Sequence, residues 1–227
     1  ALLSRQLAAD SLEFMTVFSR NGEGPGDRAR VAANVLPDTY SMYWTSTADA
    51  VLTRLERRLR TELGALLEPE DANPAGLTEQ QILTLASIVE WEARFEDEKP
   101  VIAGLYLNRL RRGMPLQADP TVAFAIGERR RLYNDDYRVE HPYNTYLRRG
   151  LPPGPINNPS LGSIRAVVRP DTHDYLFMVA TQDGRHAFNV TYDAHLEAVR
   201  EWQRWIREQF RIKRQREAEA SAAAGAR

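Results

Sequence analysis

The chain of 227 residues contains no cysteine and only two lysines, Lys99 and Lys213. Without cysteine it has no disulfide framework, no thiol nucleophile and no cysteine-ligated zinc site. No apolar run approaches the ~18–20 residues that a bilayer-spanning helix needs, and the chain does not open with a signal peptide. We therefore expect the sequence, which starts at Ala1, to be a mature or trimmed soluble portion.

The charges are nearly balanced, with 30 Lys and Arg against 31 Asp and Glu. A net charge of −1 argues against a nucleic-acid binder that depends on bulk electrostatics. Arginine-rich runs at residues 109–112 and 129–131 suggest phosphate binding. Acidic residues are interleaved throughout, however, and this favours solvated basic faces. With 43% hydrophobic residues, the chain can bury a substantial core.

Helices are predicted where apolar residues recur every three or four positions or where capping signals occur. These segments are residues 47–67, 78–92, 100–113, 119–127 and 160–169. Thr78 and Gln81 fit a capping box. Asp119 is the expected N-cap of a short helix, with Pro120 at its first position and Gly127 after its end.

The pattern changes to that of strands near residue 175. Residues 175–181 and 186–190 read as a hairpin joined by a two-residue turn at Asp183 and Gly184. A helix over residues 193–210 follows, and we expect residues 211–227 to fray from it or to be disordered. The sequence therefore predicts an α+β fold, a helix-rich domain with a small antiparallel sheet.

Metal chemistry has little support in the sequence, and we expect neither a metal nor a cofactor. None of the histidines has a partner at metal-ligand spacing on a clear helix. The four are His141, His173, His186 and His195.

Two carboxylates near the end of the helix at 78–92 are better candidates for chemistry. Glu90 and Glu92 project about 200° apart, so only one of them can face a given pocket. The helical wheel does not decide between them. Glu90 shares its side with Leu83 and Ala86, which would desolvate it and raise its pKa, as a general acid requires. The alternative interpretation is an exposed glutamate at the end of a surface helix.

Polar and aromatic residues on proline-fixed loops follow, at residues 116–121, 143–146, 150–159 and 186–188. Amides, hydroxyls and rings of this kind suit a groove for a sugar chain. The alternatives are that Asp119 only caps a helix and that the proline-rich run is only an extended connector.

The motifs Ala-Ser-Ile-Val-Glu-Trp-Glu-Ala (86–93), Leu-Asn-Arg-Leu (107–110), Leu-Gln-Ala-Asp-Pro-Thr (116–121), Tyr-Asn-Thr-Tyr (143–146) and Gly-Leu-Pro-Pro-Gly-Pro-Ile (150–156) stand in this order. Their order and spacing resemble the endolytic murein transglycosylase family, also called YceG-like or MltG. Leu-Pro-Asp-Thr-Tyr (36–40) and the segment 184–195 fit as well, so the resemblance covers roughly residues 36–205. The sequence departs from the family pattern at Phe124, where tyrosine is common, and at Ser160, where glycine is usual.

The resemblance implies a bacterial cell-wall enzyme with one N-terminal membrane anchor, a LysM-like subdomain and a catalytic domain. Residues 1–35 would then be the C-terminal part of the LysM-like subdomain, 36–210 the catalytic domain and 211–227 a charged, alanine-rich tail. The implied location is the cytoplasmic membrane, crossed once, with the catalytic domain on the periplasmic side. The implied partners are peptidoglycan glycan strands and cell-wall synthases, the penicillin-binding proteins, with no nucleic acid.

By the same resemblance Glu90, the first of the Glu-x-Glu pair, would be the catalytic residue. The implied reaction cleaves the β-1,4 bond between N-acetylmuramic acid and N-acetylglucosamine, leaves 1,6-anhydro ends and terminates strand elongation. Glu92 would then be a supporting or structural partner. The other residues expected to bind substrate or to support the site are Asn108, Gln117, Asp119, Thr121, Tyr143, Asn144, Thr145, Tyr146 and His186.

Three alternatives remain at this stage. The chain could be a non-catalytic glycan-binding or scaffold module that docks on cell-wall synthases. It could bind nucleic acid through its arginine runs, with a steep salt dependence. It could also be a hydrolase that uses water and a second carboxylate, which would leave a reducing end in place of the anhydro ring.

Overall fold

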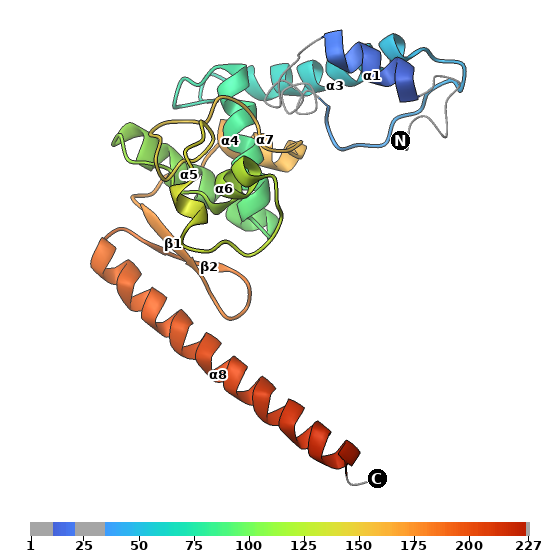
Figure 1. Ribbon diagram of the computed structural model, residues 1–227. Coiled ribbons are helices and arrows are strands. Elements are labelled where there is room, and N and C mark those ends of the chain that lie inside the picture. Colours follow the sequence, from blue (N-terminus) through green and yellow to red (C-terminus); the bar gives the residue numbers. More distant parts are fainter. Residues whose placement is uncertain (1–10, 21–34, 226–227) are drawn as a thin grey trace. The chain divides into compact units, whose positions relative to one another are not determined.

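The computed structural model describes residues 11–20 and 35–225 of the chain (Figure 1). It divides into two compact units, the first ending at His173 and the second beginning at Asp174. This division falls inside the range expected to be one catalytic domain, residues 36–210. The expected LysM-like segment, residues 1–35, lies outside the described residues apart from 11–20 and residue 35.

Helices make up the regular structure described in the first unit (Figure 1). They are α1 (Ser11–Arg20), α3 (Ala48–Leu67), α4 (Glu79–Glu92), η2 (Glu96–Glu98), α5 (Lys99–Arg111), α6 (Asp119–Ile126), η3 (Asp136–Arg138) and α7 (Leu161–Val168). Short α7 contacts α3, α4 and α5, and α6 contacts α4. Helices α4 and α7 therefore lie at the centre of the packing that positions the candidate site.

Helix α4 forms where its capping signal predicts. The Thr78 hydroxyl accepts from the Gln81 N–H, and the Gln81 side chain accepts from the Thr78 N–H, so the capping box is confirmed. Every residue from Ile82 to Val89 is buried. The sequence showed only one apolar stripe, but α5, α6 and α7 all contact this helix. Burial on all sides makes α4 a fixed support for the carboxylates at its end.

Helices α1 and α3 form a small core of their own. Phe14 and Val17 of α1 pack with Val51 and Leu55 of α3. The N-cap of α3 is Thr47, as the expected start of this helix implies. Its segment from 47 to 67 is confirmed as a helix by the bounds of α3.

The expected capping role of Asp119 is wrong. The N-cap of α6 is Ala118, and no side chain caps this helix. Asp119 is its first residue, and its carboxylate accepts hydrogen bonds from Tyr137 and Tyr146 instead. Gly127 ends α6 in the left-handed region with φ 74°, as predicted.

The second unit is a hairpin packed against one long helix. Strands β1 (Phe177–Ala180) and β2 (His186–Asn189) are antiparallel, and both contact α8 (Tyr192–Gly225). The turn has three residues, 182–184, because Thr181 donates its N–H to the Arg185 carbonyl. Gly184 takes up φ 80° within it. The expected two-residue turn is therefore wrong, although the hairpin itself is confirmed.

Helix α8 continues well beyond the predicted end at residue 210. It runs to Gly225, so the expectation that residues 211–225 fray or are disordered is wrong. Ion pairs one turn apart, Glu208 with Arg211 and Lys213 with Glu217, stabilise this extension. The alanines that follow have the highest intrinsic helix propensity.

The expected α+β class is confirmed, since a helix-rich chain carries one two-stranded antiparallel sheet. Within residues 11–20 and 35–225, no helix has the length and apolar character that a bilayer crossing requires.

Close packing of α5 leads to a prediction about stability. A methyl group added at Gly104 would lie 2.5 Å from the Asp171 carbonyl oxygen and 2.7 Å from His173 Nε2. Gly104→Ala should therefore lower the free energy of unfolding by about 1–3 kcal/mol. Gly64→Ala on α3 is the matched control, because nothing lies within 4 Å of its added methyl group. There alanine should stabilise the protein by about 0.5–1 kcal/mol. Urea unfolding of both variants tests this, and equal effects would contradict the packing described.

Candidate active site

Glu90 and Glu92 face different neighbours, as their spacing on α4 predicts. The carboxylate of Glu90 meets the start of α7, whereas that of Glu92 meets Tyr106 on α5. The two groups therefore sit in separate environments, and these environments differ in what they do to a proton.

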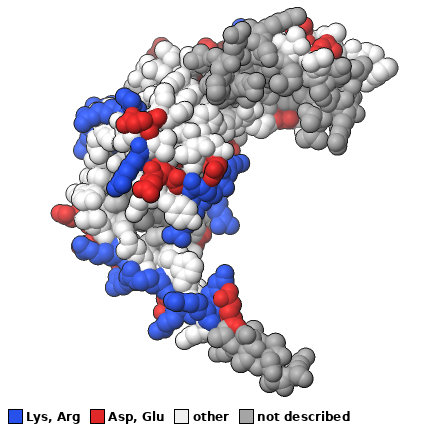
Figure 2. Space-filling view, in the orientation of Figure 1, with Lys and Arg blue, Asp and Glu red and all other residues white. Residues whose placement is uncertain are grey.

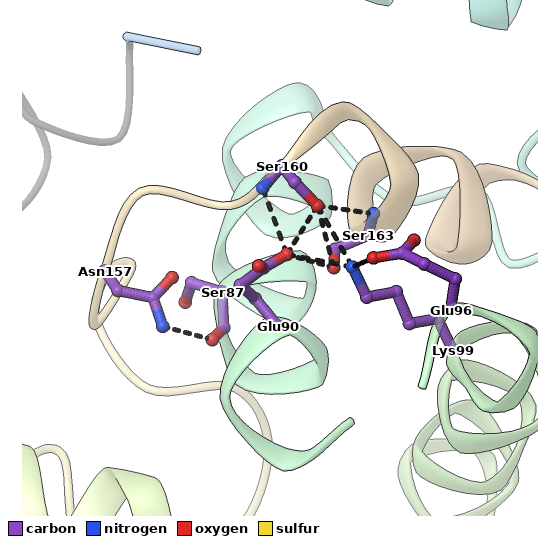
Figure 3. A network of polar contacts seen from close by, with 7 residues as sticks. All are labelled: Ser87, Glu90, Glu96, Lys99, Asn157, Ser160 and Ser163. Carbon is purple, nitrogen blue, oxygen red and sulfur yellow. Dashed lines mark hydrogen bonds and ion pairs between the residues drawn. The ribbon is translucent and has the colours of Figure 1, made fainter. Parts of the chain in front are cut away.

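A dense set of donors surrounds Glu90 (Figure 3). Its Oε2 accepts from the Ser160 hydroxyl at 2.6 Å, the Ser160 N–H at 3.1 Å and the Ser163 hydroxyl at 2.5 Å. Lys99 Nζ lies 3.3 Å from the same oxygen. The Lys99 side chain is 4% exposed and that of Glu90 31% exposed. One carboxylate oxygen thus ties α4 to α7 and to the start of α5.

These contacts decide the protonation of Glu90. Partial burial raises its pKa, but hydrogen bonds from Ser160 and Ser163 and the charge of Lys99 outweigh burial and lower the pKa below its usual value. The expected rise of this pKa is therefore wrong. The local neighbours Leu83 and Ala86 are buried as expected, but donors 70 residues later in the chain determine the outcome. At neutral pH Glu90 is ionised and has no proton to give.

Glu92 has the opposite environment. Its Oε1 accepts one hydrogen bond at 2.9 Å, from the hydroxyl of the buried Tyr106. Burial raises the Glu92 pKa to about 7, and the negative charge of Asp119 adds to this rise. The Tyr106 hydrogen bond and the charge of Arg109 oppose it. A carboxyl group with a pKa near 7 can both donate and accept a proton at neutral pH.

Asp119, whose charge acts on Glu92, is held by two tyrosines. Tyr146 donates to Asp119 Oδ1 at 2.6 Å and Tyr137 donates to Oδ2 at 3.3 Å. The two rings meet edge to face, with centroids 4.6 Å apart. Burial and the Asp119 charge raise the pKa of Tyr137 to about 12 and that of Tyr146 further. Both phenols therefore stay protonated and donate to the Asp119 carboxylate.

Arg109 fixes the loop before α6 at Leu116 and Gln117. This buried side chain donates to the Leu116 carbonyl at 2.7 Å and to Gln117 Oε1 at 3.2 Å. Gln117 is exposed and has φ 50°, in the left-handed region that few residues other than glycine adopt. Strain of this kind is often found at functional sites, so Gln117 remains a good candidate for substrate contact.

Buried polar residues hold the two loops together beneath the site. The hydroxyls of Thr121 and Thr145 lie 2.8 Å apart, and Thr145 also accepts from the Ala118 N–H at 3.1 Å. Asn144 donates to the Tyr137 carbonyl at 3.0 Å and accepts from the Tyr146 N–H. These three predicted residues are buried, so they position Asp119 and its tyrosines from below.

The structure does not bring every predicted residue to this place. Asn108 donates to the His173 carbonyl at 2.7 Å and so fastens the end of the first unit. Tyr143 is buried, and its ring lies 4.6 Å from that of Phe124. His186 begins β2 in the second unit.

A cleft of about 720 Å³ opens beside Glu92. It joins a carboxyl group of raised pKa to aromatic and basic side chains, a combination typical of candidate binding sites. The residues that line it are Trp91, Glu92, Asp119, Pro120, Ala123, Arg129, Arg130, Arg131, Leu132 and Tyr137. Among the described residues, no three or more His, Asp or Glu side chains are grouped to hold a metal ion.

Sequence reasoning missed several residues that define these environments. Tyr106 donates a hydrogen bond to Glu92, and Lys99 and Ser163 donate hydrogen bonds to Glu90. No local pattern marks Tyr106, because its partner is 14 residues away on another helix.

The chain belongs to the YceG-like family, whose model matches residues 3–201. It is 41% identical over 119 residues to the endolytic murein transglycosylase of Bacillus subtilis. This alignment covers 52% of this chain and 33% of that protein. It is 32% identical over 161 residues to the endolytic murein transglycosylase of Streptococcus pneumoniae. This alignment covers 68% of this chain and 29% of that protein. The alignments thus span about a third of the length of these curated relatives.

A solved structure supports the fold. The crystal structure of a yceG-like protein from Listeria monocytogenes aligns with a TM-score of 0.66 at 32% identity. The alignment covers 73% of this chain and 54% of that one.

Proposed function

We propose that the chain is the catalytic part of an endolytic lytic transglycosylase of peptidoglycan, with Glu92 as its general acid and base. The observation that carries this proposal is a carboxyl group with a pKa of about 7 at the wall of a cleft. The family membership and the names of the relatives support the substrate class.

Glu92 is proposed in place of Glu90 for two physical reasons. Glu90 is held ionised by Ser160, Ser163 and Lys99, so it cannot protonate a leaving group at neutral pH. Its Oε2 is already occupied by four donors. Glu92 has one such donor among the contacts described, and it lines the cleft.

The proposed reaction needs one carboxyl group. Protonated Glu92 gives its proton to the glycosidic oxygen as the bond from C1 of N-acetylmuramic acid breaks. The 2-acetamido group and the charge of Asp119 stabilise the positive charge that develops at C1. The C6 hydroxyl of the same sugar then bonds to C1 and returns its proton to Glu92. The product is a 1,6-anhydro end, no water is consumed, and the intramolecular attack benefits from high effective molarity.

The wider biological setting follows from the same proposal. The substrate would be a nascent glycan strand, and cleavage would end its elongation by synthases of the penicillin-binding type. The catalytic part would act on the outer side of the cytoplasmic membrane, held there by an anchor elsewhere in the protein.

Mass spectrometry of products released from purified sacculi tests the function. Anhydromuropeptides, lighter than the corresponding reducing muropeptides by one water, are the expected products. Reducing ends in their place would show a hydrolase. Binding to sacculi without any soluble product would show a glycan-binding module and would overturn the proposal.

A further inference from the structure

The cleft beside Glu92 is lined by three consecutive arginines, Arg129, Arg130 and Arg131. A sugar backbone of N-acetylated hexosamines has no charge for them to pair with. Their presence next to the candidate acid therefore calls for an anionic group on the substrate other than the sugar backbone itself.

Arg130 is already neutralised by the protein. Its guanidinium makes two parallel hydrogen bonds with Asp136, at 2.7 and 2.8 Å, and its Nε lies 2.6 Å from Glu128. This arginine fixes the loop that follows α6. It is not free to bind a ligand.

Arg129 and Arg131 differ from it. Both are exposed, and within the part of the chain that the structure describes neither forms an ion pair with a carboxylate. The guanidinium of Arg129 lies over the Trp91 ring at 4.3 Å from its centroid. Stacking on the ring restrains the Arg129 side chain and leaves its N–H groups available at the edge. Trp91, Arg129 and Glu92 all line this cleft, so the positive charge held on the ring faces the same space as the candidate acid.

At several places on the face shown in Figure 2, acidic side chains lie next to basic ones. Two unpaired arginines in a cleft suit one or two carboxylates, whereas a nucleic-acid backbone requires a longer basic track.

We propose that Arg129, with Arg131, binds a carboxylate of the peptide stem attached to N-acetylmuramic acid, so that the enzyme prefers peptide-bearing strands to denuded ones. This inference rests on the proposed function. In peptidoglycan the lactyl group of muramic acid carries the stem in amide linkage, and the free carboxylates lie along the stem. Guanidinium and carboxylate pair through charge-assisted hydrogen bonds, which are stronger than neutral ones.

A binding experiment tests the inference without depending on cleavage. The probes are soluble glycan oligomers of equal length, one set carrying tetrapeptide stems and one set stripped of them by an amidase and then amidated at the lactyl carboxylates that this cleavage frees. Glu92→Gln is the background protein, so that the oligomers stay intact. We expect about tenfold tighter binding of the peptide-bearing set, weakening with salt. Addition of Arg129→Ala should remove this difference, and addition of Arg60→Ala, an exposed arginine on α3, should preserve it.

The outcomes separate the two proposals. Equal binding of both sets by the background protein would overturn the inference, as would an Arg129→Ala variant that keeps the full preference. Thermal unfolding of each variant shows that it is folded. Wild-type protein that binds peptide-bearing strands preferentially but releases no products would overturn the proposed activity and leave the inference standing. If the wild type cleaves, its ratio of kcat/KM for the two sets should fall about tenfold in Arg129→Ala.

Discussion

Glu92→Gln should lower the turnover of peptidoglycan strands by about 1,000-fold or more, with binding retained. The substitution keeps the shape of the side chain and removes the proton that the leaving oxygen needs. Loss of a positioned general acid costs about 100- to 10,000-fold. Release of anhydromuropeptides over time, followed by mass spectrometry, measures the effect.

The same substitution should leave the fold intact. The pKa of Glu92 is raised in the folded state, so ionisation of this group removes stability as the pH rises toward and through about 7. A neutral glutamine at this position avoids that loss. At pH 8 the free energy of unfolding of Glu92→Gln should therefore equal or exceed that of the wild type.

Glu90→Gln is the matched control on the same helix, two residues away. Its expected effect is on stability, because a neutral amide oxygen accepts weaker hydrogen bonds from Ser160 and Ser163 and has no charge to pair with Lys99. We expect a loss of about 2 kcal/mol at pH 7. Since the Glu90 pKa is lowered by folding, the carboxylate stabilises the fold above its usual pKa, and this contribution disappears as the pH falls. A folded Glu90→Gln without activity, together with an active Glu92→Gln, would contradict the assignment.

Activity should fall about tenfold for each pH unit above about 7. Only protonated Glu92 can act as the acid, and its pKa is raised to about 7 by burial and by the charge of Asp119. The pH profile of kcat/KM measures this fall, the alkaline limb of the profile. A profile that declines only above pH 9, or already above pH 5, would not fit Glu92 as the acid.

Tyr106→Phe should move this limb to higher pH. The Tyr106 hydroxyl donates to Glu92 at 2.9 Å, and this bond favours the ionised carboxylate. Without it the pKa of Glu92 rises further. Tyr43→Phe is the control, because Tyr43 is 85% exposed in the segment before α3 and should leave the limb in place. Equal profiles for Tyr106→Phe and the wild type would show that Glu92 does not govern the limb.

Local signals predicted the helices well. The Thr78 capping box and Gly127 after α6 act within a few residues, and the structure has both. The predicted end of the last helix at residue 210 is wrong, because α8 runs to Gly225, and the alanines near its C-terminus are strong helix formers. The predicted role of Asp119 as a helix cap is wrong, because its carboxylate accepts hydrogen bonds from Tyr137 and Tyr146, which lie 18 and 27 residues later in the chain.

The choice between Glu90 and Glu92 could not be made from the sequence of α4. Both flank the apolar stripe, and the difference between them lies in residues brought in by folding. Ser160 and Ser163 reach Glu90 from 70 and 73 residues away, and Tyr106 reaches Glu92 from the next long helix. A pKa depends on these distant donors, so only the folded chain separates the two carboxyl groups.

The most direct test of this account is the titration of the two carboxyl groups in the wild-type protein, followed by NMR with carbon-13 glutamate. Signals are assigned with Glu90→Gln and Glu92→Gln. The account predicts that Glu92 titrates near pH 7 and that Glu90 titrates below the usual glutamate pKa of 4.5. A Glu90 signal titrating near pH 7, with Glu92 ionised well below it, would contradict the central claim.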